Sequence, residues 1–252
     1  MFNDFTFEYL KRAFEIVKDK FELRLLGTGL GSTNGKPQLY LRHDVDVSVK
    51  RALMMAEFEA DCGVMATYMF IPNSRLYDLR GCRDTLRRLN LLGHEVALHF
   101  DVDGRGREMG ANIQDVHDEI EEDCRKISEI TGDPVRSVSF HRPMPQFIGG
   151  DPTVCGRINA YAAALMGCYI SDSKGQWRSG DPVQLLHATA EPVVQLLIHP
   201  IWYGTNHMDP QQRLEEFFLS ETRDLIRTER SKFDADLAFT VPGVRRANYE
   251  AV

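Results

Sequence analysis

Short apolar segments alternate with amphipathic segments along most of this chain, and this alternation is the feature that most restricts its fold. The apolar segments are rich in β-branched and aromatic residues, so we predict strands at 38–43, 64–71, 95–100, 135–141, 168–173 and 193–200. The other segments space apolar residues three or four positions apart, which predicts helices at about 7–21, 48–61, 76–94, 112–132 and 210–238. Strands that alternate with helices pair in parallel through right-handed crossovers. We therefore expect an α/β fold, for which a closed or nearly closed barrel fits better than an open sheet, although periodicity is compatible with both.

Length and charge narrow the class of protein further. A chain of 252 residues suits one large α/β domain better than two small ones, so we expect a single domain over 1–252. The formal net charge of −7 argues against nucleic acid as the main partner. The longest nearly uncharged stretch, 158–171, is too short to span a bilayer, the first residues do not read as a secretion signal, and the five cysteines form no disulfide-like pattern. We expect a cytoplasmic protein without membrane insertion, and the sequence does not indicate its oligomeric state.

Potential metal ligands and acid–base groups stand where the predicted strands end. Five strands end in this way, with the residues His43, Asp44, Asp46, His99, Asp101, Asp103, His141, Arg142, Asp172 and His199. Because the carboxyl ends of parallel strands meet at one edge of a sheet, these side chains are expected to face one another. A single histidine or aspartate at such a position is usually a boundary residue or a helix cap. Five such ends together indicate a site.

The mixture of carboxylates and imidazoles indicates a divalent metal. Nitrogen ligands favour zinc or another transition ion over magnesium or calcium. Asp44 and Asp46 are two positions apart at a strand end, so both can face the same cavity. A metal on one of them relieves their mutual repulsion and leaves the other free to act as a base.

Five short motifs resemble, in the same order, those of the polysaccharide deacetylase-like proteins, the NodB-homology or carbohydrate esterase family 4 group. They are LRHDVD (41–46), GHEVALHFD (93–101), SFHRP (139–143), SDSKGQWR (171–178) and LLIHPIWY (196–203). More narrowly, the sequence resembles a divergent branch that carries HDVD and HPxW and often accompanies surface-polysaccharide biosynthesis. The resemblance implies a distorted (β/α) barrel of about seven parallel strands. It also implies metal-dependent hydrolysis of an N-acyl, typically N-acetyl, group from an amino sugar or glycan intermediate.

The resemblance further implies roles for the residues that match the family motifs. Asp44 matches the catalytic base and His199 the general acid. Arg142 falls near the arginine that orients the base. Asp46 takes the place of the metal-binding aspartate, and His99 that of the first metal histidine.

Substrate contacts are implied for the last two motifs. Asp172 and Trp177 lie in the region of the family's fourth motif, and Trp202 follows the final histidine. The two tryptophans are expected to stack on a sugar ring, with apolar lining of the barrel mouth as the alternative.

One position departs from the family pattern. The second motif normally supplies another histidine four residues after the first, and here that position is Asp103. We expect His141 to be the third metal ligand, because it lies at a strand end, with Asp103 as the alternative. His43 is expected to support the site from behind the ligands, and His94, at the opposite edge, to be structural.

Other functions stay open from the sequence. The same fold supports hydrolases of cyclic imides and ureides, which keep the metal and change the substrate. The altered ligand set is also compatible with an inactive sugar-binding relative that holds no metal, or with a purely structural barrel. The sequence does not indicate the sugar, its carrier or the acyl group.

Overall fold

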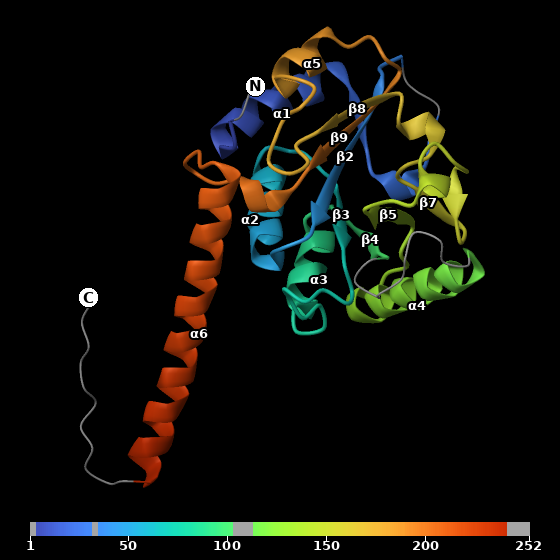
Figure 1. Cartoon of the computed structure of the whole chain (residues 1–252). Helices are drawn as coiled ribbons and strands as arrows, with labels where there is room; N and C mark the ends of the chain where they lie inside the picture. The colour runs from blue at the N-terminus through green and yellow to red at the C-terminus, as the bar shows by residue number, and fades with distance from the viewer. Residues whose placement is uncertain (1–3, 32–34, 103–112, 241–252) are drawn as a thin grey trace. The chain divides into compact units, whose positions relative to one another are not determined.

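A curled sheet forms the centre of the fold in the computed structural model, which describes residues 4–31, 35–102 and 113–240 (Figure 1). The strands are β1 (Glu22–Arg24), β2 (Gln38–Val45), β3 (Thr67–Phe70), β4 (Glu95–Asp101), β5 (Ser137–His141), β6 (Thr153–Val154), β7 (Arg157–Asn159), β8 (Cys168–Ser171) and β9 (Val193–Ile198). The helices are α1 (Phe7–Lys20), α2 (Val49–Asp61), α3 (Arg83–Leu91), α4 (Ile113–Thr131), α5 (Pro182–Ala188) and α6 (Pro210–Thr240). By its internal contacts the chain divides into two compact units, residues 1–208 with the sheet and residues 209–252 with α6. The expectation of one domain over 1–252 stays a prediction.

The strands form one sheet in the order β6-β7-β5-β4-β3-β2-β9-β8, with β1 beside the first half of β2. All pairings are parallel except the one between β6 and β7. The sheet is curled, and in the described part of the chain its order ends at β6 on one side and at β8 on the other. It therefore forms a half-barrel that stays open between these two strands (Figure 1). The expected distorted (β/α) barrel is confirmed, and the short strands β1, β6 and β7 join those that the sequence predicted.

Alternate residues of a strand point to opposite faces, and on the outer face of the half-barrel most of them are apolar. Leu39, Leu41 and Val45 of β2 belong to one core cluster together with Phe14 of α1 and Met55 of α2. In Figure 1, α1 to α4 lie around the outside of the strands. Full burial of each large apolar side chain contributes about 1.5–3 kcal/mol, so this layer supplies most of the stability.

The inner face carries the other residues of each strand, and many of them are polar. On β2 they are Gln38, Tyr40, Arg42 and Asp44, all buried. A small apolar cluster fills the middle of the interior, with Leu26, Tyr40, Met69, Ala97, Ala160, Ala162 and Leu165. Polar groups therefore gather at the two ends of the half-barrel, above and below that cluster.

A tight turn at Leu26–Thr28 closes the amino end of the interior. The Gly27 N–H and the Thr67 hydroxyl both donate to Glu95 Oε2 at 2.8 Å, and the Ser137 hydroxyl donates to Glu95 Oε1 at 2.7 Å. A Cβ atom on Gly27 would lie 2.4 Å from Glu95 Oε1 and 2.7 Å from the Cβ atom of Arg136. Only glycine lets the backbone come this close to the buried carboxylate.

Two helices differ from the predicted ones. The helix expected at 76–94 begins only at Arg83, because the Asp78 carboxylate accepts from the backbone N–H groups of Arg80 and Gly81 and holds a turn there. The short helix α5 was not predicted. The sequence nevertheless contains the signals for its start, because Asp181 caps the helix and Pro182 occupies the first helical position.

The second unit contains one long helix, α6, near the bounds expected for it. The Asp209 carboxylate caps its start by accepting from the Gln212 N–H at 2.9 Å. Arg227 with Asp224 and Lys232 with Glu229 form ion pairs along it. Among the described residues no helix, α6 included, combines the length and apolar character that crossing a membrane requires.

We predict that Gly27→Ala destabilises the protein by about 1–3 kcal/mol, because the added methyl group overlaps Glu95 and Arg136. Gly167→Ala is the matched control, since a Cβ atom there meets nothing within 4 Å. Urea denaturation of both variants measures the difference, and equal stability of the two would contradict this account of the amino end.

Candidate active site

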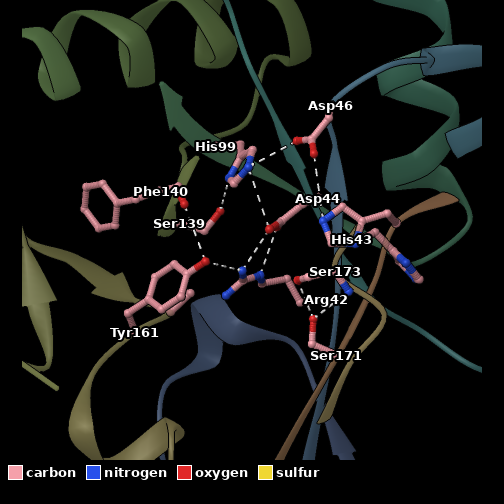
Figure 2. A network of polar contacts seen from close by, with 12 residues as sticks. Arg42, His43, Asp44, Asp46, His99, Ser139, Phe140, Tyr161, Ser171 and Ser173 are labelled. Carbon is pink, nitrogen blue, oxygen red and sulfur yellow. Dashed lines mark hydrogen bonds and ion pairs between the residues drawn. The ribbon is translucent and has the colours of Figure 1, made fainter. Parts of the chain in front are cut away.

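Four of the predicted site residues meet at the carboxyl edge of the sheet, and Figure 2 labels three of them, Asp44, Asp46 and His99. His99 Nε2, from β4, lies 3.3 Å from Asp46 Oδ1 and 3.7 Å from Asp44 Oδ2, at the end of β2. His199, just after β9, places its Nε2 atom 3.8 Å from Asp46 Oδ2. Parallel pairing of β2 with β9, and of β2 with β4 through β3, brings these strand ends to the same edge.

Asp44 is held by an arginine on its own strand. Arg42 donates from Nε to Asp44 Oδ1 at 2.9 Å and from Nη2 to Asp44 Oδ2 at 2.8 Å, a bidentate pair whose two side chains are almost fully buried. Burial by itself raises the pKa of Asp44, but the Arg42 charge outweighs it and holds the pKa below its ordinary value. Asp44 is therefore ionised at neutral pH.

The partner expected for Asp44 was Arg142; the structure places Arg42 beside Asp44, and the role of Arg142 stays a prediction. Arg142 is exposed and has a left-handed backbone, with φ of 54°, at the end of β5. The arginine in contact with Asp44 is Arg42, which lies two positions earlier on β2. The period of two along a strand could have found it, because residues i and i+2 share one face.

His99 is oriented by the neighbouring strand. Its Nδ1 atom lies 2.6 Å from the Ser139 hydroxyl, which stands directly opposite on β5, so Nε2 is left to face the carboxylates. Burial raises the pKa of Asp46, but its contact with His99 and the nearby imidazole charges lower the pKa below its ordinary value. Two carboxylate oxygens, Asp44 Oδ2 and Asp46 Oδ1, thus face the same imidazole nitrogen, His99 Nε2.

The residues present suit a divalent cation in their chemistry. Asp46 Oδ1 is buried without a hydrogen-bond partner while it faces the His99 imidazole, which leaves a carboxylate oxygen available as a ligand. His141, half-buried, stacks edge-on to His99 with ring centroids 5.6 Å apart, and its Nδ1 atom lies 3.2 Å from Asp101 Oδ1. In the described part of the chain, no three such residues already stand together as a ligand set. Asp103, the alternative third ligand, lies outside the described residues.

His199 is paired with a buried carboxylate. Its Nδ1 atom lies 2.6 Å from Asp172 Oδ1, and its backbone N–H donates to both Asp172 oxygens, at 3.0 and 3.1 Å. Burial lowers the pKa of His199, but the charge and hydrogen bond of Asp172, with Asp46 and Asp44 beyond, raise it to about 9. The imidazole is therefore protonated at neutral pH, as a general acid must be.

The substrate contacts expected for Asp172 and Trp177 do not fit their positions. Asp172 is fully buried behind His199, and Trp177 is only 1% exposed within the core. Asp172 thus orients His199, and Trp177 packs in the core. Trp202, in the turn Pro200–Trp202, keeps part of its ring exposed, so its contact with a substrate stays a prediction.

His43 and His94 belong to a separate polar cluster on the outer face of the sheet. His43 Nε2 lies 2.6 Å from Glu59 Oε1, and the Tyr68 hydroxyl donates to Glu59 Oε2 at 2.7 Å. His94 accepts from the Ala66 N–H and lies close to the same glutamate. This cluster ties α2 to β2 and β3 behind the site, and neither imidazole reaches the carboxyl edge.

Comparison with known proteins gives distant structural relatives. No protein-family model matches the chain, and no curated protein matches its sequence. Similar solved structures include the wild-type CE4 family pseudoenzyme BA3943 from Bacillus anthracis, with 14% identity, a TM-score of 0.44, and coverage of 76% of this chain and 63% of that one. The peptidoglycan deacetylase PdaC from Bacillus subtilis has 13% identity, a TM-score of 0.43, and coverage of 83% and 99%. A family 4 carbohydrate esterase from Streptomyces lividans, in complex with acetate, has 14% identity, a TM-score of 0.41, and coverage of 67% and 81%.

The chain spans less than two thirds of the pseudoenzyme's length, at 63%. Identities of 13–14% concern the course of the chain, so the chemistry of this site has to be argued from its own side chains.

We predict that His199 in the metal-free protein titrates near pH 9, and that Asp172→Asn moves its pKa toward the ordinary value of about 6.5. Because the folded-state pKa is raised, the stabilisation by this pair is fully present below pH 6.5 and is lost as pH rises through about 9. NMR titration of the His199 ring measures both values. Asp181→Asn, which removes a remote helix-capping carboxylate, is the control that should leave the pKa of His199 unchanged.

Proposed function

We propose that this chain is a metal-dependent hydrolase that removes an N-acyl group, typically N-acetyl, from an amino sugar or glycan intermediate. Surface-polysaccharide biosynthesis is the process that the motif resemblance implies. The observation that carries the proposal is the convergence on Asp46 of His99 from one side, at 3.3 Å, and His199 from the other, at 3.8 Å. A ligand pair, an ionised carboxylate and a protonated imidazole at one sheet edge are the parts that amide hydrolysis requires.

Asp46 and His99 would hold the metal, with His141 as the expected third ligand. Carboxylate oxygen with imidazole nitrogen suits Zn²⁺ or a similar transition ion. When bound, such an ion supplies a polarised water and a positive charge for the developing oxyanion. The Ser139 hydroxyl at His99 Nδ1 keeps that ring in the orientation a ligand needs.

Asp44 would accept the proton of the attacking water. Its Oδ2 atom faces His99, and each carboxylate oxygen can accept a further hydrogen bond besides the one from Arg42. Arg42 keeps Asp44 ionised, so the base is ready at neutral pH. Its lowered pKa makes it a weak base in isolation, which is sufficient only for a water already acidified by a cation.

His199 would donate the proton that the leaving amine needs. Amines leave poorly unless they are protonated, and His199 stands on the other flank of Asp46 from His99. Asp172 keeps the imidazole charged and fixes its orientation through Nδ1, so that Nε2 presents the proton to the site. Trp202 is the aromatic side chain from which we expect stacking on the sugar ring.

We predict that the zinc-reconstituted protein binds about one metal per chain and releases acetate from N-acetylated amino sugars. His99→Ala should lose the metal, whereas Asp44→Asn should keep it and lower kcat about 10²–10⁴-fold. Elemental analysis and an acetate-release assay measure these outcomes, with the exposed His187→Ala as the control for both. Chelation should abolish activity, and added zinc should restore it.

The same experiments separate the alternatives. Metal content below about 0.2 per chain after reconstitution would favour a non-catalytic sugar-binding relative. Full metal loading with hydrolysis of cyclic imides or ureides, and none of acetylated sugars, would assign the site to the other substrate class.

A further inference from the structure

The open side of the half-barrel is joined by a side chain rather than by strand pairing. Gln195 lies on the inner face of β9, near one end of the sheet, and is fully buried. Its Nε2 atom donates to the carbonyl of Ala160 at 2.8 Å and to that of Leu165 at 3.2 Å. Ala160 directly follows β7, near the other end of the sheet, and Leu165 lies in the turn Ala163–Leu165 that leads from β7 to β8, so this one amide contacts the connection between the two ends at both of its sides.

Arg42 crosses the same opening. Its Nη1 atom donates to Gln195 Oε1 at 2.8 Å, and its Nη2 atom donates to the Tyr161 hydroxyl at 2.9 Å. The guanidinium also lies over the Tyr161 ring, 4.7 Å from the centroid. Figure 2 shows Arg42 between Tyr161 and Asp44. The arginine that holds the base is thus itself held by residues from both ends of the sheet.

The orientation of the Gln195 amide is fixed by these contacts. Its oxygen accepts from a guanidinium, and its nitrogen donates to two carbonyls, so a flipped amide would set donor against donor and acceptor against acceptor. Gln195 therefore binds Arg42 and the carbonyls of Ala160 and Leu165 at the same time. A displacement of either carbonyl would move the amide oxygen that Arg42 contacts, because both contacts are made by one planar group.

The geometry points to Gln195 as a positioning residue that couples closure of the half-barrel to the placement of Asp44 through Arg42. This inference rests on the proposed function, in which Asp44 is the base. Gln195 contacts Arg42, and Arg42 contacts Asp44, so Gln195 acts on the base through the guanidinium. The bidentate pair sets the plane of the Asp44 carboxylate by the plane of the guanidinium, so a shift of Arg42 turns the base away from the attacking water. A displacement of about 1 Å can cost on the order of a hundredfold in rate.

Gln195→Met tests the inference, because methionine has a similar length and cannot make these hydrogen bonds. We expect kcat to fall at least about tenfold, with KM within about twofold and zinc content unchanged. Thr67→Val is the matched control: Thr67 is also a fully buried inner-face residue, and it hydrogen-bonds Glu95 at the opposite end of the interior. Thr67→Val should lose stability and keep kcat.

A double variant tests whether Gln195 acts through Arg42. Arg42→Lys keeps the charge and removes the bidentate geometry, so it should lower kcat more than Gln195→Met does. If the effect of Gln195 passes through Arg42, adding Gln195→Met to Arg42→Lys should cost little more. Independent, multiplying losses would overturn the coupling, as would unchanged kcat in Gln195→Met or an equal loss in Thr67→Val.

Failure of the proposed function is recognised separately. If the zinc-loaded wild-type protein cleaves no amide substrate, the function is wrong, and crystal structures of wild type and Gln195→Met then test the inference directly. An Asp44 carboxylate that turns away from its wild-type position in Gln195→Met supports the coupling, and an unchanged carboxylate overturns it.

Discussion

The buried ion pair between Arg42 and Asp44 is the interaction on which the interior of this half-barrel depends. Taking both charges out of water costs several kcal/mol for each, and their attraction offsets that cost only if the remaining donors are satisfied. Here the other guanidinium hydrogen bonds go to Gln195 and Tyr161. Loss of either charge alone would leave the other buried and unpaired, at a cost of about 3–5 kcal/mol. The group that readies the proposed base is therefore also part of the fold.

The two ends of the interior treat a buried carboxylate in opposite ways. At the amino end, Glu95 accepts from neutral donors, and burial raises its pKa in spite of those hydrogen bonds. At the carboxyl end, Asp44 has a guanidinium beside it, and its pKa is lowered. At the amino end, uncharged N–H and O–H donors surround the buried carboxylate of Glu95. At the carboxyl end, the Arg42 guanidinium pairs with Asp44, at the edge where parallel β/α folds place their sites.

The imidazoles of His99 and His199 have the same arrangement of contacts but differ in the group that holds Nδ1. In both His99 and His199, Nδ1 is held by an oxygen and Nε2 faces Asp46. The partner of His99 is the hydroxyl of Ser139, whereas the partner of His199 is the carboxylate of Asp172. A carboxylate stabilises the imidazolium and a hydroxyl does so far less, which suits one ring to donating a proton and the other to binding a cation.

The sequence by itself determined most of the long strands and helices and the edge at which the site forms. The period of two in β2 decides which residues share a face, the three-to-four spacing decides which faces of the helices are buried, and parallel pairing brings the polar strand ends of Asp44, Asp46, His99 and His199 together. These are consequences of local pattern, so they can be predicted without knowing any long-range contact.

Only the tertiary structure decided which partners these residues have. It placed Arg42 beside Asp44, and it buried Asp172 and Trp177 where motif position indicated substrate contacts. It also used Gln195 to join the two ends of an open sheet. The physical reason is that a partner depends on how far the sheet curls and where it stays open, and this follows from packing between segments more than a hundred residues apart, as with Arg42 and Gln195.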